Sequence, residues 1–179
     1  MFQDALETLL LAVVLFVGVR ATLQNTRVDG HSMEPTLHDG QYLMVNKLAY
    51  KLGMPQRGDI VVFPSPQDGE RALIKRIVGL PGEEIAIVNG QVYVNNALLL
   101  EPYVASERSS TNWGPRVLGP NEYLVLGDNR NNSNDSRNFG PVTESQIIGK
   151  AWFSLWPPEY GLALPHVSTL ATGSHGILP

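Results

Sequence analysis

The segment EEIAIVNGQVYVNN, residues 83–96, restricts the fold more than any other part of the sequence. Two runs of alternating apolar residues flank Asn89-Gly90, and this pair is favoured in a two-residue type I′ turn because both turn positions need a positive φ. The segment therefore predicts a β-hairpin. Similar short runs rich in Val, Ile and Tyr recur between Gly, Pro, Asn and Asp residues, and after the N-terminal segment no long helical period appears.

The body of the chain is therefore predicted to be mainly β. Residues 101–120 lack periodicity and contain many polar and turn residues, so we expect a long excursion from the sheet there. Residues 157–179 contain Pro, Gly and Ser and are expected to form an irregular C-terminal tail. The expected strands are residues 42–46, 59–63, 72–78, 84–88, 91–94, 123–126 and 147–155.

An uninterrupted run of apolar residues and glycine occupies residues 9–19. A helix over residues 5–23 would be roughly 28 Å long, which is close to the hydrocarbon thickness of a bilayer. We therefore expect an N-terminal membrane anchor over residues 1–27 and a folded β domain over residues 28–156. A cleaved signal peptide, a buried core helix and a helix lying on the membrane surface are the alternatives.

Composition excludes several classes of function. The 179 residues carry a net charge of −4, with Lys and Arg scattered along the chain, which argues against nucleic acid as a partner. The chain has no cysteine, so disulfides, thiolate metal sites and a cysteine nucleophile are excluded. A chain of this length is expected to form one domain with an appendage.

Ser32 stands out because it begins SMEPTL, a proline-stiffened turn. Pro35 disfavours helical backbone at the preceding residue and so fixes a bend that leaves the Ser32 hydroxyl available. A serine in a turn more often hydrogen-bonds the backbone, and a nucleophilic serine needs a base to take its proton. His31 would point to the opposite face of an extended chain, His38 lies beyond the bend, and two further histidines belong to the tail.

A neutral lysine is the alternative base, and the segment ALIKRIVGLPGE supplies one. Strand alternation places Lys75 on one face and Arg76 on the other, each between two apolar residues. Arginine stays protonated in proteins, whereas a lysine deprived of water loses its proton, so only Lys75 can be the base. Its pKa must fall from about 10.4 to about 7, which burial can supply. The alternative is a lysine with its stem on the sheet and its ammonium in water.

The segment GDNRNNSNDSRNFGPV, residues 127–142, is dense in Asp, Asn and Ser. A calcium loop that starts at Asp128 would need glycine at its sixth position and glutamate at its twelfth, where the sequence has Ser133 and Phe139. The calcium interpretation therefore fails. A solvated loop is the ordinary interpretation, but such a loop also suits precise hydrogen bonding at a site, and Asp135 with Arg137 could pair to make it rigid.

Four motifs in this order, SMEPTL, GDIVVF, IKRIVGLPGE and GDNRNNSNDSRNFGPV, resemble those of the type I signal peptidases of bacteria and plastid thylakoids. The resemblance covers about residues 6–156 and includes the N-terminal apolar segment. It implies a β-rich domain of two antiparallel sheets, attached to the membrane by one N-terminal transmembrane helix. The family's nucleophile and general base fall at Ser32 and Lys75, in agreement with the choice made from the residues alone.

The resemblance also implies supporting residues. Ser133 matches a serine that hydrogen-bonds the lysine, while Asp135 and Arg137 match a supporting ion pair. At the position of Gly30 some relatives have a serine that donates to the oxyanion, while others have glycine as this chain does. The Ser32 backbone N–H would be one oxyanion donor here. Shallow pockets for small side chains are shaped in the family by the positions that match Met33, Leu37, Leu73 and Ile74.

The function that the resemblance implies is removal of N-terminal signal peptides from translocated preproteins by a serine endopeptidase without a metal or cofactor. The implied partners are membrane lipid and signal peptides with small residues at the −1 and −3 positions. The implied location is the plasma membrane or a thylakoid, with the catalytic domain on the extracytoplasmic side. Arg20 and Arg27 favour the opposite orientation, because positive charge near an anchor normally stays in the cytoplasm.

Two other classes of protein remain open. A self-cleaving repressor-type protease uses a similar serine and lysine, but it would need a DNA-binding helix-turn-helix in place of the apolar segment. A non-catalytic, membrane-anchored binding protein would share the fold if the serine and the lysine lay apart in space.

Overall fold

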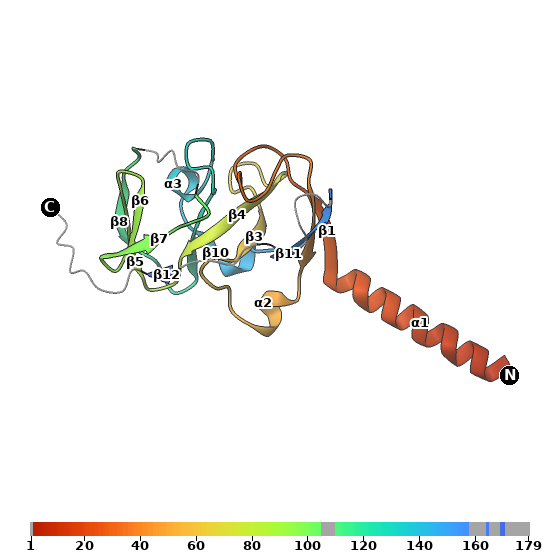
Figure 1. Ribbon diagram of the computed structural model, residues 1–179. Coiled ribbons are helices and arrows are strands. Elements are labelled where there is room, and N and C mark those ends of the chain that lie inside the picture. The colour runs from red at the N-terminus through yellow and green to blue at the C-terminus, as the bar shows by residue number, and fades with distance from the viewer. Residues whose placement is uncertain (1, 105–109, 158–163, 165–168, 171–179) are drawn as a thin grey trace.

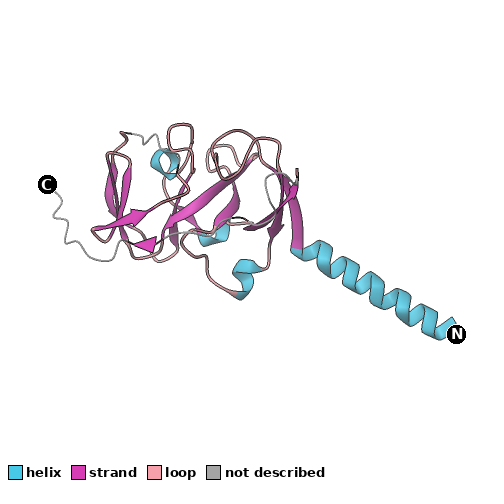
Figure 2. Ribbon diagram, in the orientation of Figure 1, coloured by secondary structure: helices cyan, strands magenta, loops and turns pink. Residues whose placement is uncertain are grey.

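The structure is a computed structural model that describes residues 2–104, 110–157, 164 and 169–170. A long N-terminal helix projects from a β-rich body (Figure 1). Within the body the helices are short and the strands form two antiparallel sheets (Figure 2). The prediction of a mainly β domain of two antiparallel sheets is confirmed.

The larger sheet has seven strands in the order β1-β2-β11-β3-β4-β9-β10. All pairs of neighbours in this sheet are antiparallel. The strand that carries the expected base, β4, therefore lies inside the sheet between β3 and β9. The bounds are β1 Leu23–Arg27, β2 Tyr42–Asn46, β3 Ile60–Pro64, β4 Ala72–Gly79, β9 Glu122–Leu126, β10 Val142–Thr143 and β11 Gly149–Trp156.

The smaller sheet has five strands in the order β12-β7-β6-β5-β8. Its centre is the predicted hairpin, in which Asn89 and Gly90 both have positive φ, 51° and 74°. The bounds are β5 Glu84–Val88, β6 Gln91–Val94, β7 Ala97–Leu100, β8 Trp113–Val117 and β12 Thr169–Leu170. Three short helices complete the body, namely α2 Ala49–Leu52, α3 Ser136–Phe139 and the 3₁₀ helix η1 Glu144–Gln146.

The two sheets share a hydrophobic core where β4 and β9 meet the smaller sheet. Val78 and Leu126 of the larger sheet pack there with Ile85 and Leu118, and all four are nearly fully buried. A Cβ placed on Gly79, the last residue of β4, would lie 2.8 Å from Leu118 Cδ1. The glycine therefore permits a close approach of the β4 backbone to the second sheet.

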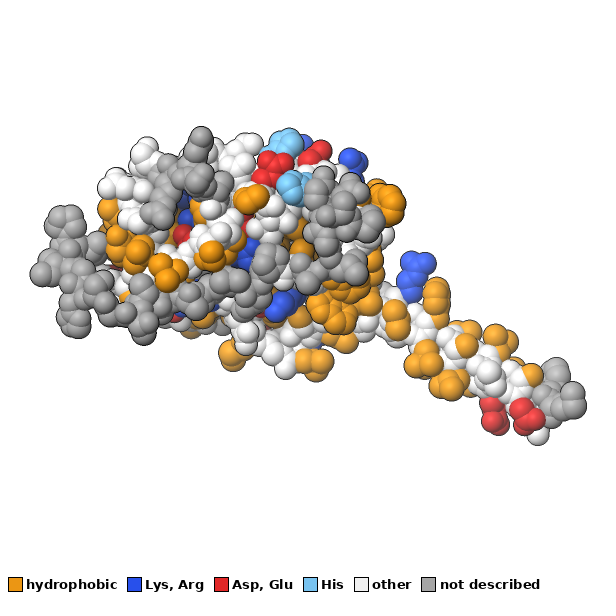
Figure 3. Space-filling view, in the orientation of Figure 1, with side chains coloured by type: hydrophobic (Ala, Val, Ile, Leu, Met, Phe, Trp, Pro, Cys, Tyr) orange, Lys and Arg blue, Asp and Glu red, His pale blue; other side chains and the backbone are white. Residues whose placement is uncertain are grey.

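The N-terminal helix α1, Phe2–Thr22, projects away from the body, and its apolar side chains are exposed (Figure 3). We expected a spanning helix over residues 5–23. Among the described residues, no helix combines the length and apolar character that crossing a bilayer requires. The helix ends at Thr22, and the following residues form β1, which pairs with β2.

All seven expected strands are present, with ends within two residues of those predicted. The excursion expected over residues 101–120 contains β8, which the sequence did not reveal because its side chains are mostly exposed and lack alternation. Of the tail expected over residues 157–179, most lies outside the described residues. One part of it, β12, pairs with β7.

Candidate active site

Ser32 begins a turn between β1 and β2 whose backbone is fixed from two sides. Leu37 N donates to Met33 O at 2.9 Å, and both side chains are buried in the core beneath the turn. On the other side, Asn129 N donates to Ser32 O at 3.0 Å. The apolar residues of SMEPTL thus anchor the turn, while its serine remains partly exposed.

Lys75 on β4 directs its amine at Ser32. Lys75 Nζ donates to Ser32 Oγ at 2.7 Å and to the Ile74 carbonyl oxygen at 2.9 Å. Only 3% of Lys75 is exposed, so the alternative with its ammonium in water is wrong. Burial lowers the pKa of Lys75 to about 8, against the opposing effect of the Asp135 and Asp128 carboxylates. About one amine in ten is then neutral at pH 7.

The neighbouring histidine is turned away from the serine. His31 Nδ1 lies 2.8 Å from Glu34 Oε1, and its side chain is exposed. The hydrogen bond to Glu34 raises the pKa of His31. His31 therefore belongs to an exposed polar pair, and Lys75 is the titratable group in contact with the Ser32 hydroxyl.

The predicted pair of Asp135 and Arg137 forms a two-point contact. Arg137 Nε donates to Asp135 Oδ1 at 2.8 Å, and Arg137 Nη2 donates to Asp135 Oδ2 at 2.8 Å. Asp135 Oδ2 also accepts from Gly127 N at 3.1 Å, which ties the loop to the end of β9. Although burial raises the pKa of Asp135, its hydrogen bonds and the charge of Arg137 outweigh that effect and hold it below its usual value.

Ser133 is close to the site. The resemblance implies a hydrogen bond from Ser133 to the lysine, but Lys75 Nζ is instead bonded to Ser32 Oγ and the Ile74 carbonyl oxygen. Ser133 Oγ is buried and makes no hydrogen bond of good geometry in the described part of the chain, but it lies near enough to Asp135 to help lower the pKa of that carboxyl. The side chain packs instead against Gly127, where an added Cβ would lie 2.2 Å from Ser133 Oγ and 2.5 Å from Ser32 O. Only glycine lets the end of β9 approach both serines.

A cleft of about 320 Å³ opens in front of Ser32 and Lys75. Its walls include three of the four expected pocket residues, Met33, Leu73 and Ile74. The fourth, Leu37, lies in the core with no exposed surface and is not part of the wall. The cleft therefore has apolar side chains beside the reactive pair, while Asp29, Arg71 and Asn132 belong to the polar part of its wall.

One edge of β4 is free along this cleft. Residues 72–75 pair with β3 on one side, whereas pairing with β9 on the other side begins only at Arg76. The unpaired edge belongs to the residues that line the cleft. An extended peptide in the cleft would therefore find backbone groups able to form a β-ladder.

The buried pair of Arg76 and Asp128 was missed from the sequence. Arg76 Nε donates to Asp128 Oδ1 at 2.9 Å and Nη2 donates to Oδ2 at 2.7 Å, and neither side chain is significantly exposed. Alternation did place Arg76 on a face with apolar neighbours, and a buried arginine needs a carboxylate partner. The sequence does not indicate which carboxylate, because 52 residues separate the two.

In the described residues, no group of three or more His, Asp or Glu side chains is arranged to hold a metal ion. The reactive groups that the cleft brings together are the Ser32 hydroxyl and the buried Lys75 amine. A hydroxyl 2.7 Å from a lysine of lowered pKa is the arrangement of a serine hydrolase that uses lysine in place of histidine.

Comparisons with known proteins agree with this class. The family model "Signal peptidase, peptidase S26" matches residues 2–156. A probable signal peptidase I-2 of Synechocystis is 42% identical over 164 residues, covering 87% of this chain and 74% of the relative. Signal peptidase I of Leptolyngbya laminosa is 40% identical, covering 87% and 80%. Signal peptidase IB of Staphylococcus aureus is 35% identical, covering 81% and 84%.

The chain therefore belongs to the signal peptidase family, peptidase S26. It is a hydrolase of the serine endopeptidase type, and the family is membrane-associated.

Gly127→Ala is expected to lower kcat/KM for cleavage of a preprotein at least about 100-fold, because the new Cβ forces the β9 end away from the Ser32 backbone. Gly119→Ala is the matched control, since its Cβ would meet only the flexible Glu122 side chain at 3.4 Å. Steady-state cleavage assays of both variants measure the effect. Near-normal activity of the Gly127 variant would show that this close approach does not matter.

Proposed function

We propose that Ser32 is the nucleophile and Lys75 the general base with which this chain removes signal peptides from preproteins. The observation that carries the proposal is the 2.7 Å contact between Lys75 Nζ and Ser32 Oγ, made by an amine whose pKa burial lowers to about 8. The non-catalytic alternative required the two groups to lie apart, so their contact argues against it.

The proposed reaction is an acyl transfer to serine followed by hydrolysis. The neutral Lys75 amine takes the Ser32 proton as Oγ bonds to the scissile carbonyl carbon. The protonated amine then returns a proton to the leaving amine as the C–N bond breaks, which leaves an ester on Ser32. Lys75 next takes a proton from water as the water oxygen attacks the ester carbon. It returns that proton to Ser32 Oγ as the ester C–O bond breaks, which restores the free serine and the neutral amine. The Ser32 backbone N–H is proposed as one oxyanion donor.

The proposed substrate mode is addition of a β-strand. The residues around the cleavage site would pair with the free edge of β4, residues 72–75, while Met33, Leu73 and Ile74 shape pockets for small side chains at −1 and −3. A cleft of about 320 Å³ shared among several side chains supports small rather than large residues at these positions.

Asp135, Arg137 and Ser133 are proposed as supporting residues. The two-point ion pair holds the loop that follows β9, and its hydrogen bond to Gly127 N holds the strand end beside the serine. The Ser133 hydroxyl, buried beside Gly127, is proposed to pair with Lys75 once the amine rotates toward a substrate.

We also propose that residues 1–27 attach the catalytic domain, residues 28–156, to the extracytoplasmic face of a plasma or thylakoid membrane as a single-pass anchor. Support comes from the exposed apolar side chains of α1, which project from the body. Tethering would confine enzyme and membrane-bound substrate to one thin layer and so raise their effective concentration.

Ser32→Ala and Lys75→Met are each expected to abolish cleavage of a preprotein in detergent. The first change removes the nucleophile and the second removes the base. Both proteins should remain folded, because Lys75→Met replaces a buried amine with an apolar side chain of similar length. Cleavage is measured by gel electrophoresis, with Lys51→Met, an exposed lysine on α2, as the control. Turnover that survives either change would remove that residue from its role.

The dependence of kcat/KM on pH should follow the neutral form of Lys75. Because its pKa is about 8, kcat/KM is expected to rise about tenfold per pH unit below pH 7 and to level off above about pH 9. Initial rates across this range with a peptide substrate test the expectation, and Lys51→Met should leave the profile unchanged. A profile that is flat between pH 6 and 9, roughly one unit or more to either side of the expected midpoint, would contradict a lysine base.

The proposed topology predicts that the catalytic domain is protected from added protease in sealed, inside-out membrane vesicles and is degraded once detergent opens them. Residues 1–27 should be required for recovery of the chain with the membrane fraction after an alkaline wash. Degradation of the domain in intact inside-out vesicles would place it on the cytoplasmic side, as Arg20 and Arg27 indicate.

A further inference from the structure

A short segment of the smaller sheet reaches into the catalytic sheet next to the base. Residues Glu101–Tyr103 follow β7, and the Arg76 guanidinium stacks on the face of the Tyr103 ring, with 4.0 Å from Arg76 Cζ to the ring centroid. Tyr103 is only 8% exposed, and Arg76 is fully buried. A buried cation on an aromatic face is held more strongly than an exposed one, because neither group is solvated by water.

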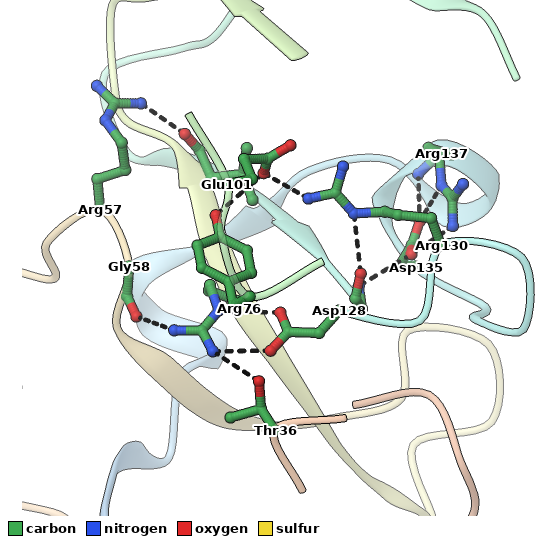
Figure 4. Close-up of polar contacts among 12 residues, drawn as sticks. Thr36, Arg57, Gly58, Arg76, Glu101, Asp128, Arg130, Asp135 and Arg137 are labelled. Carbon is green, nitrogen blue, oxygen red and sulfur yellow. Dashed lines mark hydrogen bonds and ion pairs between the residues drawn. The ribbon is translucent and has the colours of Figure 1, made fainter. Parts of the chain in front are cut away.

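The same segment makes a second buried contact through Glu101. Glu101 Oε1 accepts a hydrogen bond from Arg130 Nη2 (Figure 4). It also accepts a hydrogen bond from the Tyr103 hydroxyl at 3.0 Å. The side chains of Glu101 and Arg130 are 9% and 3% exposed. Arg130 Nε in turn donates to Gly127 O at 3.0 Å. Tyr103 and Glu101 therefore hold two arginines that belong to the catalytic sheet and its loop.

Both arginines hydrogen-bond to the segment after β9 that contacts the Ser32 backbone. Arg76 holds Asp128 through two hydrogen bonds, and Arg130 holds the carbonyl of Gly127. Asn129, the residue after Asp128, donates its backbone N–H to the Ser32 carbonyl oxygen. Residues 127, 128 and 129 are thus each held by a hydrogen bond, and the last of them is bonded to the serine.

We infer that Tyr103 and Glu101 are positioning residues for the Ser32–Lys75 pair, an inference that rests on the function proposed above. They touch neither reacting atom, and they act through Arg76 and Arg130 on residues 127–130. Arg76 is also the strand neighbour of Lys75, so the Tyr103 ring steadies the same stretch of β4 that carries the base. The smaller sheet thereby contributes to catalysis through this one segment as well as through core packing.

The test compares two substitutions of Tyr103 in the full chain in detergent, with a preprotein as substrate. Tyr103→Leu removes the ring beneath Arg76 and is expected to lower kcat at least tenfold while KM changes less than twofold. Tyr103→Phe keeps the ring and should retain at least a third of the wild-type kcat. Pro102→Ala is the matched control, because Pro102 lies in the same segment but is exposed.

A purely structural role makes a different prediction for the same variants. If Tyr103 had only a structural role, Tyr103→Leu would reduce the folded fraction, measured by tryptophan fluorescence and size-exclusion chromatography. The kcat per folded molecule would stay unchanged. Wild-type kcat per folded molecule in Tyr103→Leu, or equal losses in Tyr103→Phe and Tyr103→Leu, would overturn the inference. Cleavage that persists in Ser32→Ala or Lys75→Met would instead overturn the proposed function, whatever the Tyr103 variants do.

Discussion

Exclusion of water from the Lys75 amine is the constraint on which the site depends. Lowering its pKa from 10.5 to about 8 corresponds to roughly 3 kcal/mol of destabilisation of the charged form. That is a large part of the roughly 5–15 kcal/mol by which a domain is usually stable. The penalty applies below about pH 8 and fades as pH rises toward 10.5, where the unfolded chain also loses the proton. Burial of apolar side chains in the core beneath the Ser32 turn and around β4 offsets this free-energy penalty.

Two carboxylates beside the Lys75 amine raise its pKa and so oppose the effect of burial. Each of these carboxylates is paired with an arginine. Asp135 and Asp128 fasten the loop after β9, but their charges favour a protonated Lys75. Arg137 binds the first and Arg76 the second, each at two points, which offsets much of the negative charge. The loop is therefore held rigidly while the amine keeps a lowered pKa. An asparagine in either place would avoid the charge but would offer only one acceptor oxygen to its arginine.

The sequence was sufficient for features that depend on local chemistry. Strand alternation and the Asn89-Gly90 turn predicted the sheets. The difference between lysine and arginine singled out Lys75, which the structure places against Ser32, and its role as base is a proposal. Features that depend on distant partners were not readable. The burial of Leu37 behind the cleft and the missing contact of Ser133 follow from how the turn and the β9 loop pack.

Of the described strands, the sequence did not predict β1, β7, β8, β10 and β12, and three of these share a related physical cause. β8 is exposed along most of its length, and β1 directly follows an apolar helix, so neither shows the alternation by which a half-buried strand is recognised. β12 consists of only two residues and pairs with β7 at the edge of the smaller sheet. Such strands are fixed by the partner to which they add rather than by their own side chains.

In the proposed substrate mode, the half-paired edge of β4 limits what the enzyme can accept in a way that side-chain pockets alone would not. A ladder edge recognises the main chain, and only a segment whose own amide and carbonyl groups are unoccupied can join it. A polypeptide that has already folded has committed those groups internally. Exported proteins would thus become resistant to this enzyme as they fold. Internal sequences that carry small residues at the right spacing would be protected once folding has paired their backbone groups.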